Sequence, residues 1–179
     1  MNDLTTTLLL VRHAEPEPPR PGGGEKNGRR LTEAGRAAAA GLAAELSAEP
    51  IAAVYSSPYP RARETVAPLA AALGLPIAVL DDLRERLLSP DPLADWLDAL
   101  RRSFDDPDYA LPGGESGRQA AERVAAVLDD VANRNRGQTV VCASHGNLLA
   151  LALRRHDPAI GFEFWRGMPM PAVYRMVVR

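Results

Sequence analysis

Short apolar runs alternate with amphipathic helical segments along the chain, and this alternation restricts the fold more than any other feature. The runs expected to form strands cover residues 6–11, 51–56, 76–80, 138–143 and 172–178. Helices are expected between them, over about 32–46 and 60–73, from 92 onward, from 116 onward, and over 147–155. Strands alternating with helices of this length form a mostly parallel sheet with helices on both faces. The sequence therefore predicts an α/β fold, a three-layer α/β/α sandwich, as one domain over residues 1–179.

Three of the expected helices begin with capping signals. Thr32 can cap the first helix, and Glu33 in its first turn suits the positive end of the helix dipole. Asp91 and Pro92 have the residue types of an N-cap and a first helical position. Ser116 and Gln119 have the spacing of a capping box. These signals predict where the three helices start.

The composition is that of a globular protein, with 46% hydrophobic and 25% charged residues. A formal charge of −2 argues against a dedicated nucleic-acid binder. One cysteine, Cys142, excludes a disulfide framework and a zinc site built on cysteines. No apolar run approaches the ~20 residues of a membrane span, and the first residues lack the pattern of a signal peptide. We therefore expect a cytoplasmic protein that binds neither nucleic acid nor membranes.

Basic side chains gather where the expected strands end. Arg12 and His13 follow the first strand, Arg61 lies in the first turn of the helix after the second strand, and His145 follows the fourth. Ligands of open parallel sheets bind beyond these carboxyl ends, where helix N-termini also present free N–H groups. Any one of these residues alone is more simply explained as structural. Together, two imidazoles and two guanidinium groups predict a site for a phosphate dianion.

Five motifs in the same order resemble those of the histidine phosphatase superfamily, the phosphoglycerate-mutase-like proteins. They are R-H-A-E at 12–15, L-T-x-x-G at 31–35, S-S-x-x-x-R-A-x-x-T at 56–65, G-G-E-S at 113–116 and S-H-G at 144–146. R-H-x alone would be a weak signal, whereas five ordered elements spanning most of the chain are a strong one. The resemblance implies a phosphoglycerate mutase-like fold.

The resemblance also implies a role for each site residue. His13 would be the nucleophile that forms a phosphohistidine, while Arg12, Arg61 and His145 would bind the non-bridging oxygens and stabilise charge in the transition state. Glu85, in the L-x-E context of Leu83-Arg84-Glu85, would protonate the leaving oxygen and later activate water. The neighbouring carboxylates of Asp81 and Asp82 stay open as alternative acids. No metal ion and no cofactor are expected.

The function that fits best is a metal-independent phosphomonoester hydrolase acting on a small phosphorylated metabolite. Three alternatives stay open: a cofactor-dependent phosphoglycerate mutase, a protein-phosphohistidine phosphatase, and a binding module that keeps the fold without turnover. Asn147 after S-H-G is mutase-like, but the chain lacks the hydroxyl residue and the Asn that mutases place after R-H-x-E and has Pro16 and Pro19 instead. Glu85 and the G-G-E-S turn argue against a protein-phosphohistidine phosphatase.

Several features leave the substrate and the assembly open. The G-x-W-E-G segment that often follows the acid is absent, and sugar phosphates, nucleotides, phosphoglycerates and a phosphate of the cobalamin pathway all fit. The proline- and glycine-rich loop 14–30 is either a mobile lid, with Arg20, Lys26, Arg29 or Arg30 reaching an anionic substrate, or a solvated loop. Apolar side chains near the end of the chain could form core, pocket wall or the surface of a homodimer: Phe162, Phe164, Trp165, Met168 and Met170.

Overall fold

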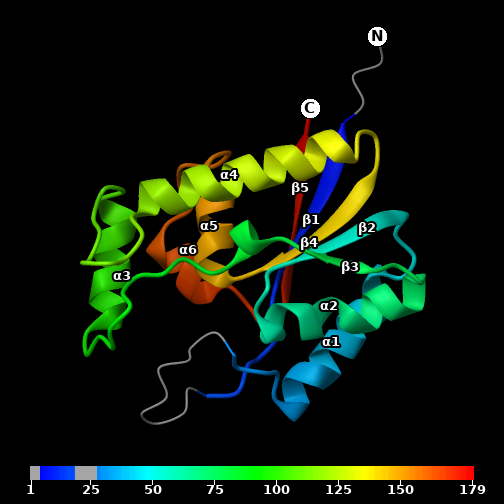
Figure 1. Ribbon diagram of the computed structural model, residues 1–179, viewed down its shortest axis with the longest axis horizontal. Helices are drawn as coiled ribbons and strands as arrows, with labels where there is room; N and C mark the ends of the chain where they lie inside the picture. Colours follow the sequence, from blue (N-terminus) through cyan, green and yellow to red (C-terminus); the bar gives the residue numbers. More distant parts are fainter. Residues whose placement is uncertain (1–4, 19–27) are drawn as a thin grey trace.

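A five-stranded sheet lies at the centre of the computed structural model, which describes residues 5–18 and 28–179 (Figure 1). Its strand order is β3-β2-β4-β1-β5. The strands are β1 (Thr6–Arg12), β2 (Ile51–Ser56), β3 (Ile77–Val79), β4 (Thr139–Ser144) and β5 (Ala172–Val178). All neighbouring strands are parallel except β5, which runs antiparallel to β1. The sheet is therefore mostly parallel, as the sequence predicts.

Helices cover both faces of this sheet (Figure 1). On one face lie α1 (Glu33–Leu46) and α2 (Pro60–Leu73). The other face carries α3 (Trp96–Asp105), α4 (Gly117–Arg134), α5 (Gly146–Arg154) and α6 (Phe162–Gly167). A single 3-10 turn, η1 (Asp81–Leu83), follows β3. The three layers confirm the expected α/β/α sandwich.

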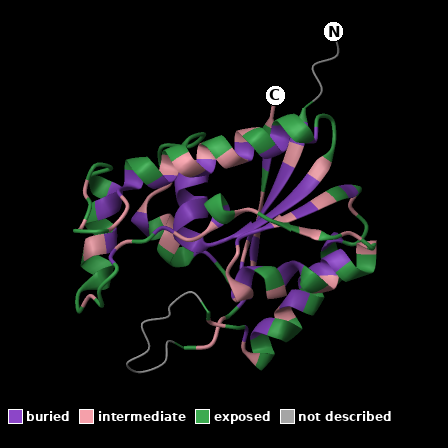
Figure 2. Cartoon of the chain, in the orientation of Figure 1, coloured by how far each residue is buried: buried purple, intermediate pink, exposed green. Residues whose placement is uncertain are grey.

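The central strands bury both of their faces, which explains their continuous apolar sequence (Figure 2). Leu8 and Leu10 of β1 pack into the core beneath α4 and α5, whereas Leu9 and Val11 pack into the core beneath α1 and α2. These side chains alternate between the two cores because successive strand residues point to opposite faces. Strand β1 thus contributes to the hydrophobic cores on both faces of the sheet and links them.

The expected helix starts are confirmed at two of three places. Thr32 caps α1, and Ser116 and Gln119 form the full capping box of α4. The expectation that Asp91 and Pro92 open a helix is wrong, because α3 begins only at Trp96. The Asp91 N–H donates to the Ser89 hydroxyl at 3.0 Å, so the backbone forms a local turn instead.

Helix α6 was not expected from the sequence. Its six residues are too few to show a clear period, and packing of Phe162 against Trp165, with ring centroids 5.5 Å apart, stabilises it. No helix among the described residues is long and apolar enough to cross a bilayer.

The position of β1 between two cores predicts a large cost for truncating its side chains. Leu10 is fully buried, so Leu10→Ala should lower the free energy of unfolding by about 2–5 kcal/mol. Val177→Thr in β5 is the control, because Val177 is 55% exposed and the change should stay within about 0.5 kcal/mol. Urea unfolding of both variants measures the difference, and equal values would contradict the assignment of Leu10 to the core.

Candidate active site

The pairing of β1 with β4 brings the two site histidines together. Arg12 at the end of β1 is in register with Ser144 at the end of β4, and the His13 N–H donates to the Ser144 carbonyl at 3.1 Å. His13 and His145 follow these paired residues, and their ring centroids lie 5.2 Å apart in an edge-to-face arrangement. Two residues separated by most of the chain are therefore neighbours at the carboxyl edge of the sheet.

His13 is buried with one ring nitrogen already bonded. Its Nδ1 lies 2.8 Å from the carbonyl oxygen of Ala14, which can only accept a hydrogen bond, so Nδ1 carries the proton. Burial lowers the pKa of His13 to about 3; the Ala14 hydrogen bond opposes this shift, and the positive charges of Arg61, Arg12 and Arg29 add to it. The ring is therefore neutral near pH 7, with its lone pair on Nε2.

His145 is fully buried beside it. Its Nε2 lies 2.7 Å from the Ser57 hydroxyl, and its Nδ1 has no hydrogen-bond partner among the described residues. Desolvation lowers the pKa of His145 well below its ordinary value, with a further contribution from the charge of Arg61. A neutral imidazole has only one N–H, so a Ser57 hydroxyl that donates to Nε2 leaves the proton on Nδ1, free for a ligand.

Arg12 reaches from the end of β1 across the N-terminus of α5. Its Nη1 donates to the Met168 carbonyl, and its Nε has no partner in the described part of the chain. Burial lowers the pKa of Arg12, and the negative charge of Glu85 partly opposes this effect. A Cβ on Gly146 would lie 2.9 Å from Arg12 Nε and 3.1 Å from Trp165 Nε1, so a larger residue there would displace the Arg12 guanidinium.

Arg61 lies in the first turn of α2 and is only 4% exposed. Its guanidinium carbon lies 5.0 Å from the centre of the Tyr59 ring, within the range of a cation–π contact. The Arg61 carbonyl accepts from the Thr65 hydroxyl at 2.7 Å, and the same oxygen of Thr65 accepts from the Ala14 N–H at 2.9 Å. Thr65 therefore fixes the backbone after His13 to the helix that carries Arg61.

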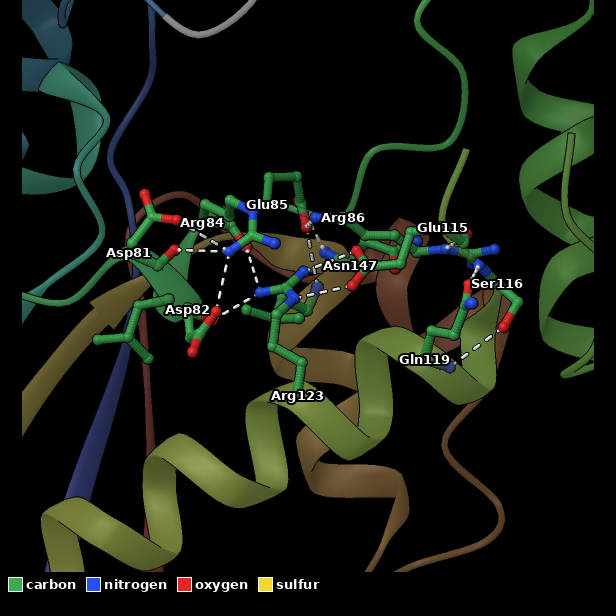
Figure 3. Close-up of polar contacts among 12 residues, drawn as sticks. Asp81, Asp82, Arg84, Glu85, Arg86, Glu115, Ser116, Gln119, Arg123 and Asn147 are labelled. Atoms are coloured by element: carbon green, nitrogen blue, oxygen red, sulfur yellow. Dashed lines mark hydrogen bonds and ion pairs between the residues drawn. The ribbon is translucent and has the colours of Figure 1, made fainter. Parts of the chain in front are cut away.

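The Glu85 side chain contacts the N-terminus of α5, the helix that begins in the S-H-G motif (Figure 3). Its Oε1 accepts from the backbone N–H groups of Arg86 at 2.9 Å and Leu148 at 3.0 Å, and its Oε2 accepts from the Asn147 N–H at 3.1 Å. Each carboxylate oxygen has two lone pairs. These three hydrogen bonds therefore occupy Oε1 fully and leave one acceptor position on Oε2 that no described residue occupies.

The two alternative acids differ from Glu85 in their surroundings. The side chains of Asp81 and Asp82 are 80% and 57% exposed, and both pair with Arg84 at 3.1 and 2.9 Å (Figure 3). Within the described part of the chain, neither side chain is hydrogen-bonded to the N-terminus of α5. The five residues singled out by sequence thus meet at one edge of the sheet, while the two aspartates are exposed and paired with Arg84.

Sequence reasoning gave no role to three groups that hold the site. Ser57 and Thr65 lie inside the S-S-x-x-x-R-A-x-x-T motif, so their motif positions could have indicated them. The Met168 carbonyl gives no signal in sequence, because it is a main-chain group brought in by tertiary packing. Of the residues left open near the end of the chain, Phe162 and Met168 are core, and Met170 is 44% exposed.

The predicted lid falls largely outside the described residues, which include neither Arg20 nor Lys26. The described ends of this loop pair with each other, since the Glu17 N–H donates to the Arg30 carbonyl at 2.8 Å. The Arg30 side chain forms an exposed ion pair with Glu64. The positive charge of Arg29 is a small contribution to the lowered pKa of His13.

Comparison with known proteins identifies the family. The model of the histidine phosphatase superfamily (branch 1) matches residues 8–178. Phosphoserine phosphatase 1 of Hydrogenobacter thermophilus is 34% identical over 153 residues, covering 77% of this chain and 70% of that protein. The metal-independent phosphoserine phosphatase of Arabidopsis thaliana is 30% identical over 165 residues, covering 83% and 68%.

A solved structure shows the same architecture. The mycobacterial glucosyl-3-phosphoglycerate phosphatase superposes with a TM-score of 0.75 at 25% identity, covering 97% of this chain and 90% of that one. Family model, relatives and fold agree with the motifs found in the sequence. The chain belongs to the histidine phosphatase superfamily, branch 1, and is a phosphatase of that superfamily.

Proposed function

We propose that this phosphatase hydrolyses monoesters of small metabolites through a phosphohistidine on His13, without a metal ion. The observation that carries the proposal is the hydrogen bond from His13 Nδ1 to the Ala14 carbonyl, in a pocket where burial keeps the imidazole neutral. That bond leaves the lone pair on Nε2, the nitrogen that can attack phosphorus. The name of the Arabidopsis thaliana relative supports metal independence.

In the first step, Nε2 of His13 attacks phosphorus, and the bond from phosphorus to the leaving oxygen breaks. Arg12, Arg61 and the Nδ1–H of His145 bind the non-bridging oxygens, where negative charge is concentrated in the transition state. Arg12 Nε and His145 Nδ1 are buried without a partner among the described residues, as expected of groups that await a ligand. The proton on Oε2 of Glu85 passes to the leaving oxygen, and the alcohol departs.

In the second step, water attacks the phosphohistidine. The Glu85 carboxylate takes a proton from this water, the N–P bond breaks, and its electron pair returns to Nε2. Inorganic phosphate leaves, and Glu85 is again protonated. The sum is one ester and one water converted to one alcohol and one phosphate.

The substrate proposal stays at the level of a small phosphorylated metabolite. The two named relatives act on phosphoserine according to their names, so phosphoserine belongs in the first screen together with sugar phosphates, nucleotides and phosphoglycerates. The single-domain organisation of residues 1–179, the cytoplasmic location, the absence of nucleic-acid and membrane partners and the possible homodimer stay predictions.

Replacing the nucleophile tests the covalent step. His13→Ala should abolish phosphate release in buffer containing EDTA, because it removes the attacking nitrogen while the wild type keeps full activity there. Trapping the wild type with radiolabelled substrate should give an acid-labile, base-stable phosphoenzyme. A phosphoserine or a phosphoaspartate would overturn the mechanism, and transfer to phosphoglycerate in place of water would favour a mutase. Phosphate binding without any turnover would favour a binding module.

The lowered pKa of His13 predicts a dependence of stability on pH. Its folded-state value of about 3 lies below the ordinary 6.5, so the unfolded protein binds more protons between these values. The free energy of unfolding should therefore fall as the pH drops from about 6.5 toward 3. When the pH is lowered from 7 to 5, the free energy of unfolding of His13→Gln should fall by about 1–2 kcal/mol less than that of the wild type. Urea unfolding at both pH values measures this difference. Equal losses would show that folded His13 is protonated at pH 5.

Replacing Glu85 separates proton donation from phosphate binding. Glu85→Gln should slow a single turnover of an alkyl phosphate about 10²–10⁴-fold, because an alkoxide leaves poorly without a proton. The burst of nitrophenolate from p-nitrophenyl phosphate should change much less, because nitrophenolate leaves unaided. Asp81→Asn and Asp82→Asn are the controls and should leave both rates unchanged. Equal losses on both substrates in Glu85→Gln would mean that Glu85 organises the pocket instead.

A further inference from the structure

The backbone that carries Glu85 has little regular structure of its own. We call residues 81–87 the Glu85 segment; it follows the three-residue edge strand β3 and contains only the single turn η1. Leu83 anchors it, because its side chain is fully buried and its carbonyl accepts from the Ser144 hydroxyl at 2.7 Å. Sheet hydrogen bonds end before Glu85, so the backbone on either side of it is held by contacts with other parts of the chain.

Arg123 of α4 holds the Glu85 segment on the N-terminal side of Glu85. Its Nη1 donates to the carbonyls of Asp82 at 2.6 Å and Arg84 at 3.1 Å (Figure 3). One guanidinium nitrogen therefore binds the two carbonyls that flank Leu83. Because Arg123 extends from an 18-residue helix, these contacts tie the segment to a rigid element.

Glu115 holds both Arg123 and the other side of Glu85. Its carboxylate accepts from Arg123 Nε at 2.8 Å and Nη2 at 2.7 Å, a bidentate pair whose side chains are only 18% and 10% exposed. Its own N–H donates to the Leu87 carbonyl at 2.7 Å, and its carbonyl accepts from Arg86 Nε at 2.8 Å. Glu115 therefore contacts the residues after Glu85 directly and reaches those before it through Arg123.

The residues around Glu115 fix its place. A Cβ on Gly114 would lie 2.3 Å from the Leu88 carbonyl oxygen, so only glycine lets the two backbones approach this closely. Ser116 and Gln119 form the capping box that starts α4 directly after Glu115. The G-G-E-S turn thus lies against the Glu85 segment and at the same time begins the helix that carries Arg123.

We infer that Glu115 and Arg123 are positioning residues that hold Glu85 where it protonates the leaving oxygen. The inference rests on the proposed function, in which Glu85 is the acid. The pair brackets Glu85 on both sides, whereas the Glu85 carboxylate itself is hydrogen-bonded, among the described residues, to main-chain N–H groups. Loosening the pair moves this carboxylate relative to the phosphoryl pocket without touching any group that binds phosphate.

The test uses Arg123→Lys, which keeps the charge but loses the bidentate pairing and the double contact with the segment. Single-turnover hydrolysis of an alkyl phosphate should slow by on the order of ten- to a hundredfold, the scale expected for a misplaced catalytic group. The nitrophenolate burst from p-nitrophenyl phosphate should stay within about twofold, because that leaving group needs no proton. Glu115→Gln, which keeps the size of the side chain, should act in the same direction.

Arg118→Lys is the matched control. Arg118 also lies on α4 and also pairs with a carboxylate, that of Asp108, through Nε at 2.6 Å and Nη2 at 2.8 Å. This pair is exposed, and among the described residues it forms no hydrogen bond or ion pair with the Glu85 segment. Arg118→Lys should leave both rates unchanged. A rate loss seen only in Arg123→Lys would then result from the lost contacts with the Glu85 segment, because both variants lose a bidentate arginine on α4.

A double-mutant cycle completes the test. If Arg123 acts through Glu85, then Arg123→Lys should change the alkyl phosphate rate by no more than about twofold when Glu85 is already Gln. The inference would be overturned if the rate losses of Arg123→Lys and Glu85→Gln multiplied in the double variant. Equal losses on both substrates in Arg123→Lys would also overturn it. Either result would leave the acid role of Glu85 intact. Equal losses on both substrates in Glu85→Gln alone would instead overturn that acid role.

Unfolding midpoints of all variants separate positioning from folding. The positioning role predicts that Arg123→Lys and Glu115→Gln remain folded under assay conditions while showing the selective loss. If neither variant folds, the pair maintains the domain as a whole and the inference is overturned.

Discussion

The parallel pairing of β1 with β4 is the constraint on which the site depends. Because Arg12 is in register with Ser144, the next residues on each strand, His13 and His145, emerge side by side at the carboxyl edge. A shift of one residue would send the side chains of a strand to the opposite face, because strand side chains alternate with a period of two. The buried alternation of Leu8, Leu9 and Leu10 between two cores opposes such a shift. The cores that stabilise the domain therefore also align the two imidazoles.

The electrostatics of the pocket follow from this burial. Desolvation lowers the pKa of both imidazoles, so near pH 7 the positive charge of the site resides on the guanidinium groups. The Met168 carbonyl, which accepts a hydrogen bond from Arg12, orients the guanidinium without cancelling its charge. Glu85, the carboxylate at this edge, is bound by main-chain N–H groups. The guanidinium groups thus supply positive charge that attracts a dianion, while the His13 imidazole beside them stays neutral and can attack phosphorus. Neighbouring residues meet these two opposite requirements.

Short motifs made much of the site predictable. Arg12, His13, Arg61 and His145 each follow a strand directly or lie in the next helical turn, so the general geometry of parallel sheets was enough to place them at one edge. Glu85 required the family resemblance, because it lies after an edge strand among several other charged residues. The expected helix start at Asp91 is wrong, because the Asp91 N–H closes a local turn on the Ser89 hydroxyl and α3 begins only at Trp96.

The sequence by itself determined the order of the elements, the two faces of the central strands and the residue types at the strand ends. These properties depend on local periodicity and capping, which act over a few residues. Tertiary structure alone decided which nitrogen of His13 is protonated, which carbonyl orients Arg12, and how Glu115 and Arg123 bracket Glu85. Each of these rests on a main-chain group or a partner distant in sequence, and no pattern of residue types specifies where a carbonyl will lie. The physical reason is that backbone groups are chemically the same at every position, so only the folded structure determines which partner each one contacts.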